Sequence, residues 1–251
     1  MSKRIIGVIL AVLLSIPALA QIDELEKQGW CEGVSIRFFA GGSEGDAFAG
    51  IVYRGALAAA RDLGADVQYV FSGWQSEMMT QQLREAVAQE PTGIAMMGHP
   101  GSPAIMPLAE EAAAKGIIMM YQNVDVPDVR AALGGGYLGA QLGPQGQALG
   151  QEAIRKFGLK EGDEAIVIVN LEQRERAQRE LGVWEALEAV GVKIVHIQPP
   201  SGIDWGADPN LAIPVITSTI AANPNVKLIV MPGGQMLGNT QTFFEAAGIE
   251  P

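Results

Sequence analysis

Short apolar runs rich in β-branched residues alternate along the chain with longer segments that have helical periodicity. Each run is ended by Gly, Pro or a polar cluster, which is typical of strands, and the longer segments place apolar residues on one face. The predicted strands are 34–39, 66–71, 93–97, 116–121, 165–169, 193–197 and 226–231. The predicted helices are 50–63, 77–89, 107–115, 145–157, 175–190, 211–222 and 235–247.

The spacing of the predicted strands is that of successive βαβ units. Because each strand is a nearly continuous apolar run, we expect parallel strands covered on both faces, and therefore an α/β fold. The rhythm breaks between residues 121 and 165, where Gly134-Gly135-Gly136 occurs. We interpret the break as a crossing between two Rossmann-like lobes, residues 32–134 and 135–251. One continuous seven-stranded sheet with an insertion is the alternative.

Two lobes of this kind place a cleft between the carboxyl ends of their strands. Ligands of open α/β sheets bind at these ends, and interfaces between lobes are preferred sites for pockets. The residues that follow the strands are therefore the candidates for function.

Composition narrows the class of protein. The chain has 251 residues with 17 Lys and Arg against 28 Asp and Glu, and its formal net charge is −11. This acidity argues against nucleic acid as a partner, because the protein repels phosphate. A lone Cys31 cannot form a disulfide within the chain, so the sequence is not that of a disulfide scaffold.

The first twenty residues have the order of a secretory signal peptide. Lys3 and Arg4 precede an uncharged apolar run, and Ala18-Leu19-Ala20 supplies the small residues of a cleavage site. The apolar run is shorter than the roughly 20 residues of a membrane span. We predict that residues 1–20 are removed on export to a bacterial periplasm. An uncleaved N-terminal anchor is the alternative.

Familiar catalytic and cofactor motifs do not occur. There is no P-loop, no Gly-x-Ser-x-Gly turn and no dinucleotide fingerprint after the first strand. One Cys and two His at distant positions do not predict a metal site. The sequence therefore predicts neither a cofactor nor a metal, and nothing in it requires catalysis.

Polar and aromatic residues follow the first four predicted strands, with Trp74 after the second. Asp46 stands near a helix start, where a carboxylate is either an N-cap or an acceptor for ligand hydroxyls. Phe48 is either a stacking surface or a core residue. The other candidates of this lobe are His99, Gln122, Asn123 and Asp125.

The second predicted lobe supplies a cluster of arginines. Arg174, Arg176 and Arg179 lie near a helix start, where a cation opposes the helix dipole, so their placement suggests a role beyond stability. A solvated face balanced by neighbouring glutamates is the alternative for two of the three. Trp205 and Gln235 follow later strands and complete the candidates. Aromatic faces cover the C–H faces of a sugar ring, and carboxylates, amides and guanidinium groups bind its hydroxyls.

The chain resembles the type I periplasmic sugar-binding proteins of ABC transporters, the group of the ribose- and galactose-binding proteins. The resemblance covers the chain from about Val34 to the end, and it depends on the order of several motifs. They are Gly45-Asp46-Ala47-Phe48, Arg54-Gly55-Ala56, the run 93–101, residues 112–116 before a strand ending in Gln122-Asn123, the run 179–184 and Asn223-Pro224-Asn225-Val226.

The resemblance implies a two-lobed, non-enzymatic receptor that closes by hinge motion on a sugar, sugar alcohol or cyclitol and delivers it to a permease in the inner membrane. It implies ligand-binding roles for Asp46, Phe48, Gln122, Asn123 and Asp125, and for Arg179 three positions before Gly182. Trp205 aligns with an aromatic of the family. Gly233 or Gly234 stands where the family has a polar side chain, so we assign that role to Gln235.

The resemblance also implies a longer chain, because only one of the family's three crossings between lobes is visible. We expect a sequence truncated in its second lobe. Two other functions stay open: a sensing module for a chemoreceptor or sensor kinase, and an exported α/β enzyme acting on glycans, which needs paired carboxylates. The leader and the lack of a helix-turn-helix argue against a cytoplasmic regulator with the same lobes.

Overall fold

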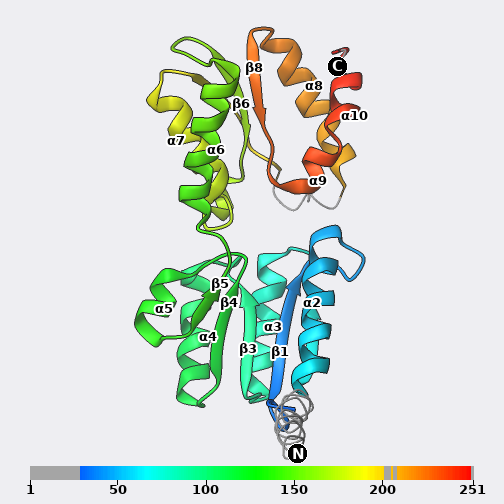
Figure 1. The fold of residues 1–251 in the computed structure, drawn as a ribbon, viewed down its shortest axis with the longest axis vertical. Helices are drawn as coiled ribbons and strands as arrows, with labels where there is room; N and C mark the ends of the chain where they lie inside the picture. The colour runs from blue at the N-terminus through cyan, green and yellow to red at the C-terminus, as the bar shows by residue number, and fades with distance from the viewer. Residues whose placement is uncertain (1–28, 201–204, 206–207, 250–251) are drawn as a thin grey trace, which may run out of the picture.

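The computed structural model describes residues 29–200, 205 and 208–249, and the predicted leader, residues 1–20, lies outside this part of the chain. The described residues form two α/β lobes stacked along the long axis of the molecule (Figure 1). Lobe one contains β1 (Ser35–Gly41), α2 (Ala47–Leu63), β2 (Asp66–Phe71), α3 (Ser76–Ala88), β3 (Gly93–Met97), α4 (Ser102–Ala114), β4 (Ile118–Gln122), α5 (Pro127–Leu133) and β5 (Gly136–Leu138). Lobe two contains α6 (Leu142–Phe157), β6 (Glu164–Ile168), α7 (Gln178–Ala189), β7 (Lys193–Ile197), α8 (Ile213–Ala222), β8 (Val226–Val230), α9 (Gly233–Gly238) and α10 (Thr240–Ala246), with short 3-10 turns at Leu171–Gln173 and Pro209–Ala212.

All the strand pairs are parallel and belong to two separate sheets. Lobe one has a five-stranded sheet of order β2-β1-β3-β4-β5, and lobe two has a three-stranded sheet of order β7-β6-β8. The first strand of each lobe along the chain, β1 or β6, therefore has neighbours from later in the chain on both sides. Two sheets exclude the alternative of one continuous seven-stranded sheet. The parallel α/β architecture predicted from the apolar runs is confirmed.

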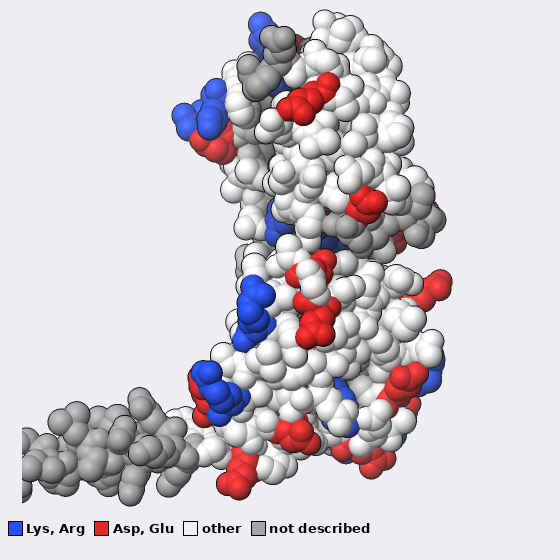
Figure 2. Space-filling model, turned by 90° about the vertical axis from the view of Figure 1, so that its right-hand side faces the viewer, with Lys and Arg blue, Asp and Glu red and all other residues white. Residues whose placement is uncertain are grey.

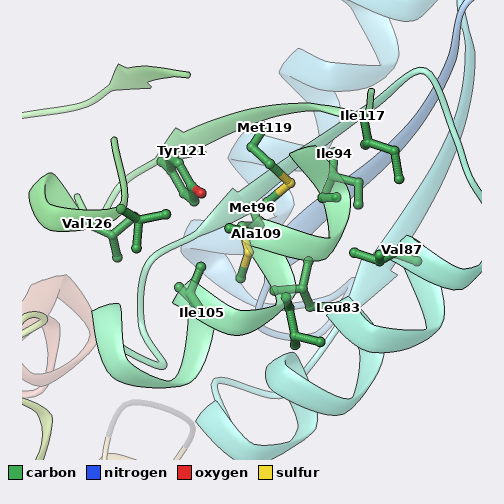
Figure 3. Close-up of a cluster of buried hydrophobic side chains, with 14 of the residues drawn as sticks. Leu83, Val87, Ile94, Met96, Ile105, Ala109, Ile117, Met119, Tyr121 and Val126 are labelled. Carbon is green, nitrogen blue, oxygen red and sulfur yellow. The ribbon is translucent and has the colours of Figure 1, made fainter. Parts of the chain in front are cut away.

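The core of lobe one lies between the sheet and helices α3 and α4 (Figure 3). The period of two along a strand sends alternate residues to this side, so Met119 and Tyr121 of β4 are buried. Their neighbours Ile118 and Met120 are exposed on the opposite side. This strand is therefore covered on one face only, whereas the apolar run predicts cover on both.

Lobe two encloses its central strand on both faces. Ala165 and Val167 of β6 pack against Val183 and Leu187 of α7. The alternate residues of β6, Ile166 and Ile168, pack on the other side against α8, α9 and α10. Helices α6 and α7 approach closely because glycines face each other, and a Cβ atom on Gly182 would collide with the backbone of α6.

Three segments differ from the sequence prediction. The stretch from 121 to 165 contains α5 and β5, and β5 pairs with β4, so the predicted boundary after Gly134 falls before the last strand of lobe one. The passage to lobe two runs instead through residues 139–141. Helix α4 begins at Ser102, with Pro107 inside it. The single helix expected over 235–247 is two helices that meet at Asn239.

Candidate functional site

A cleft of about 900 Å³ lies between the two lobes. Its walls are the segments that follow strands of both sheets, because the carboxyl ends of parallel strands in each lobe point to the same edge. Lobe one supplies Phe48, residues 73–77, His99, Pro100 and Asn123, and lobe two supplies Leu142, Asn170, Glu172, Gln173, residues 175–177, Arg179, Glu180, Pro199, Pro200, Trp205 and residues 232–236. Figure 2 shows Lys and Arg side chains where the lobes meet, next to acidic groups, and no continuous basic area on this face.

Aromatic rings form the cleft wall of lobe one. The ring centroids of Phe48 and Trp74 are 5.9 Å apart, and those of Trp74 and His99 are 5.3 Å apart. Trp74 has a positive φ of 61°, a conformation that is costly for a bulky residue. A loop that keeps this strained geometry holds the indole in a fixed place between two other rings.

Asp46 forms hydrogen bonds within the chain through both carboxylate oxygens, and the ligand contact implied by the resemblance stays a prediction. Its Oδ1 accepts hydrogen bonds from the backbone N–H groups of Phe48 and Ala49, at 2.8 and 2.7 Å, so it is the N-cap of α2. Its Oδ2 accepts a hydrogen bond of 2.9 Å from Nε1 of Trp74. Asp46 does not line the cleft. The structure thus favours the N-cap interpretation and adds a second role, the positioning of Trp74.

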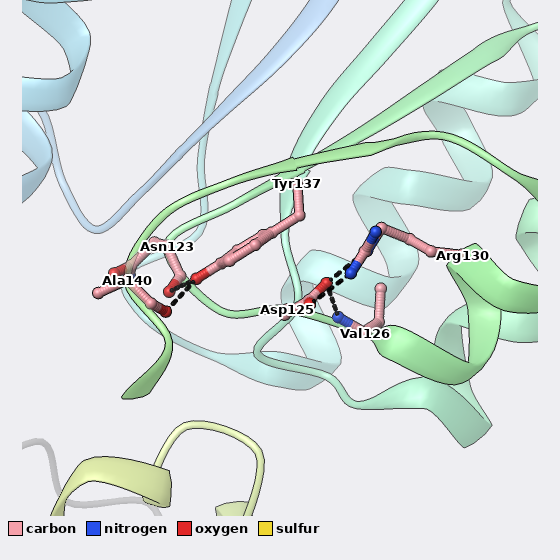
Figure 4. Close-up of polar contacts among 6 residues, drawn as sticks. All are labelled: Asn123, Asp125, Val126, Arg130, Tyr137 and Ala140. Carbon is pink, nitrogen blue, oxygen red and sulfur yellow. Dashed lines mark hydrogen bonds and ion pairs between the residues drawn. The ribbon is translucent and has the colours of Figure 1, made fainter. Parts of the chain in front are cut away.

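Of the three polar candidates at the end of β4, only Asn123 lines the cleft. The Gln122 side chain donates a 2.9 Å hydrogen bond to the carbonyl oxygen of Phe39 and ties β4 to β1. Asp125 forms a two-pronged ion pair with Arg130, at 2.7 and 2.8 Å, and accepts a hydrogen bond from the Val126 N–H (Figure 4). This pairing raises the pKa of Arg130. Both side chains thus have partners within the chain, and the ligand-binding roles of Gln122 and Asp125 stay predictions.

His99 lines the cleft and is almost fully buried. Burial, with a smaller contribution from the positive charge of Arg176, lowers the pKa of His99 from 6.5 to about 3. The ring is therefore neutral at pH 7. Its Nδ1 is buried and has no hydrogen-bond partner, which makes it a ready contact for a polar group.

Two of the three clustered arginines, Arg176 and Arg179, line the cleft. Arg179 donates a 2.9 Å hydrogen bond from Nε to the side-chain oxygen of Gln145 on α6. Arg176 lies 3.5 Å from the Oε1 atom of Glu180, which is buried in the cleft wall. The arginine cluster is thus more than the solvated face weighed as an alternative.

The last two candidates both lie in the cleft wall of lobe two. Trp205 lines the cleft and is also packed into the core of lobe two, and Gln235 lines the cleft from α9. Asp204, the carboxylate that precedes Trp205, lies outside the described residues.

Sequence reasoning assigned no ligand-binding role to Trp74 or Arg176, and it missed Glu180 as a cleft residue. Trp74 follows the second strand directly, which is itself a signal. Glu180 stands three positions before Val183 and seven before Leu187, both of which are buried on α7. That helical spacing puts Glu180 on the inner face of the helix and could have identified it.

The model of the periplasmic binding protein domain family matches residues 38–251. The chain therefore belongs to the periplasmic binding protein family, as the resemblance predicts. The members of this family are periplasmic binding proteins and not enzymes. Comparison with curated protein sequences gives no match.

Solved structures confirm the type I periplasmic binding protein fold. A periplasmic sugar-binding protein of an ABC transporter from Legionella pneumophila is 20% identical, with a TM-score of 0.72 over 84% of this chain and 75% of that one. A carbohydrate transporter protein from Acidothermus cellulolyticus, in complex with myo-inositol, is 23% identical, with a TM-score of 0.71 over 86% and 71%. A solute-binding protein from Burkholderia graminis, in complex with D-arabinose, is 19% identical, with a TM-score of 0.71 over 85% and 71%.

No helix within the described residues is both long and apolar enough to cross a membrane.

Proposed function

We propose that the protein is the solute-binding component of an ABC importer, with a sugar, sugar alcohol or cyclitol as its ligand and the permease of the importer as its partner. The observation that carries this proposal is the cleft between the lobes, which has aromatic rings on one wall and charged hydrogen-bonding groups on the other. Solved structures of similar fold hold myo-inositol and D-arabinose, and this supports the choice of ligand class.

The two walls suit the two kinds of surface on a sugar ring. Trp74 and Phe48 offer apolar faces for the C–H side of the ring. Asn123, Arg176 and Glu180 offer donors and acceptors for its hydroxyls. Binding of this kind requires no covalent bond to be made or broken, so the proposal contains no catalytic step.

Closure of the lobes on the ligand is the signal that we propose the permease recognises. The passage 139–141 between β5 and α6 is the candidate hinge. Tyr137 holds its start, since the hydroxyl lies 2.8 Å from the carbonyl oxygen of Ala140 and 3.0 Å from that of Asn123 (Figure 4). A ligand that contacts both lobes stabilises the closed state by its differential affinity. Export through the leader at residues 1–20 brings the protein to the periplasm.

A thermal-shift screen of the purified protein tests the proposal. The panel contains D-arabinose, D-galactose, sorbitol and myo-inositol, with amino acids and nucleosides as controls. A ligand at 100 times its Kd stabilises the folded state by about 2.7 kcal/mol, so a clear rise in Tm is expected for at least one sugar or polyol. A rise produced only by the amino acids or nucleosides would contradict the sugar assignment.

A further inference from the structure

Glu180 is a buried carboxylate whose hydrogen bonds are incomplete. Its side chain is 3% exposed, and Oε1 has only Arg176 as a partner, at 3.5 Å. Charge-assisted N–H to O bonds are normally about 2.7–2.9 Å long, so this pair is loose. The second oxygen, Oε2, is buried and has no partner at all. A buried carboxylate oxygen without a donor is costly, which suggests that the donor comes from outside the chain.

The cleft is where that donor would come from, because Glu180 lines it together with Arg176 and His99. Glu180 is in the first turn of α7, and Arg176 precedes the helix in lobe two. His99 follows β3 in lobe one, and its Nδ1 is also buried without a partner. Within the described part of the chain, the two cleft side chains that have a buried polar atom without a partner therefore come from opposite lobes.

We propose that Glu180, Arg176 and His99 form a subsite for a neutral hydroxyl group of the ligand, a proposal that rests on the sugar-binding function above. A hydroxyl donates one hydrogen bond and accepts two. It donates to Oε2 of Glu180 and accepts from the guanidinium of Arg176, which bridges the loose ion pair. A neighbouring hydroxyl on the same ligand binds Nδ1 of the neutral His99 and joins the subsite to lobe one.

The opposite charges of Arg176 and Glu180 also determine which ligand charge the subsite accepts. An ammonium group would be repelled by Arg176 and has no lone pair to offer its N–H donors. A carboxylate or phosphate would be repelled by the buried Glu180 and would have to compete with it for Arg176, and the neutral His99 adds no positive charge. The subsite therefore selects neutral polyhydroxy ligands over amino sugars, sugar acids and sugar phosphates.

Calorimetric titration of the wild-type protein tests the selectivity without any substitution. The probes are D-galactose with D-galactosamine and D-galacturonate, and myo-inositol with myo-inositol monophosphate. In whichever of these two sets binds, we expect the affinity for the neutral probe to exceed the affinity for each charged probe by at least about tenfold. Equal or tighter binding of a charged counterpart would overturn the subsite. If amino acids or nucleosides bind and no neutral probe does, the proposed function fails, and the subsite fails with it.

The substitution Glu180→Gln tests the residue itself, with Glu188→Gln, an exposed position on the same helix, as the matched control. Loss of the charged acceptor should weaken binding of the neutral probe roughly 10- to 100-fold. It should also narrow the preference for D-galactose over D-galacturonate, which a merely structural role would not do. The melting temperature without ligand should not fall, because no well-formed bond is lost. Binding within twofold of wild type, with unchanged selectivity, would overturn the assignment while leaving the proposed function intact.

Discussion

Lobe one faces the cleft with the aromatic rings of Phe48, Trp74 and His99, whereas lobe two faces it with the charged groups of Arg176 and Glu180. The two lobes also treat their polar groups differently. In lobe one the side chains of Asp46, Gln122 and Asp125 make hydrogen bonds within the chain, and of the residues that line the cleft from this lobe His99 has a buried nitrogen, Nδ1, without a partner. In lobe two the carboxylate of Glu180 keeps an unpaired oxygen.

This difference suggests a division of labour between the lobes. A wall of rings whose central member, Trp74, is held by a hydrogen bond to Asp46 provides a preformed shape, which lowers the cost of ordering when the ligand arrives. A loosely paired charged wall provides bonds that only a ligand can complete. We therefore expect the ligand to dock on lobe one and to draw lobe two toward it.

Of the substitutions that follow, the one in the ring wall is expected to weaken ligand binding most. Trp74→Ala removes the central ring, so the affinity for a neutral sugar should fall about 30-fold, equivalent to roughly 2 kcal/mol. Titration calorimetry measures the loss. Trp30→Ala is the control, because Trp30 does not line the cleft. Equal effects of the two substitutions would show that lobe one does not provide the docking surface.

Acid should destabilise the protein through His99. The pKa of His99 is about 3 in the folded protein and near 6.5 when exposed, so the unfolded state binds more protons between these pH values. The stability that the neutral ring provides is complete above pH 6.5 and is lost as the pH falls toward 3, at about 1.4 kcal/mol per pH unit.

A comparison with His99→Gln isolates the contribution of His99 to the pH dependence of the unfolding free energy. Between pH 7 and pH 5 the wild type should lose about 2 kcal/mol more unfolding free energy than the variant. Urea unfolding at the two pH values gives the difference. Identical losses in the two proteins would mean that His99 is not held neutral by burial.

Two substitutions of Asp46 distinguish its role as a helix cap from its role in positioning Trp74. Asp46→Ala loses both and should cost about 1 kcal/mol or more of stability. Asp46→Asn keeps a good N-cap, but its single oxygen cannot also accept from Trp74. We expect Asn to preserve most of the melting temperature and still to weaken sugar binding several-fold. If the Asn variant binds as tightly as wild type, the bond to Trp74 is irrelevant to function.

The smallest effect belongs to Asp125. Its carboxylate is paired with Arg130 and does not line the cleft. Asp125→Asn should lower the melting temperature slightly. The affinity for the sugar should stay within about twofold of wild type, because Asp125 does not line the cleft and distant sites without shared partners act independently. A loss of affinity as large as that of Trp74→Ala would restore the role that the resemblance implies for Asp125.

The sequence predicts the long elements well because their signals are long. Seven strands are apolar runs bounded by Gly, Pro or polar clusters, and the structure places a strand at each of them. Strand β5 has three residues and begins at Gly136, and α5 has seven residues. Neither is long enough for a period to be detected. The lobe boundary was misplaced for the same reason.

The site is harder to predict than the fold, because a carboxylate after a strand has more than one use. Asp46 and Asp125 have the residue type and the position of ligand contacts, yet their partners are Trp74 and Arg130, which lie 28 and 5 residues further along the chain. Glu180 stands in a charged stretch that looks like a solvated face. Only the three-dimensional packing shows which carboxylate is left with an unpaired oxygen.

Hydrogen exchange measured by mass spectrometry, with and without a saturating neutral sugar or polyol identified in the screen, tests the central claim that one ligand binds to both lobes. We predict slower exchange in two separate segments, residues 72–77 after β2 and residues 174–182 around the start of α7. Slower exchange confined to one lobe, or to regions outside the cleft, would contradict the account.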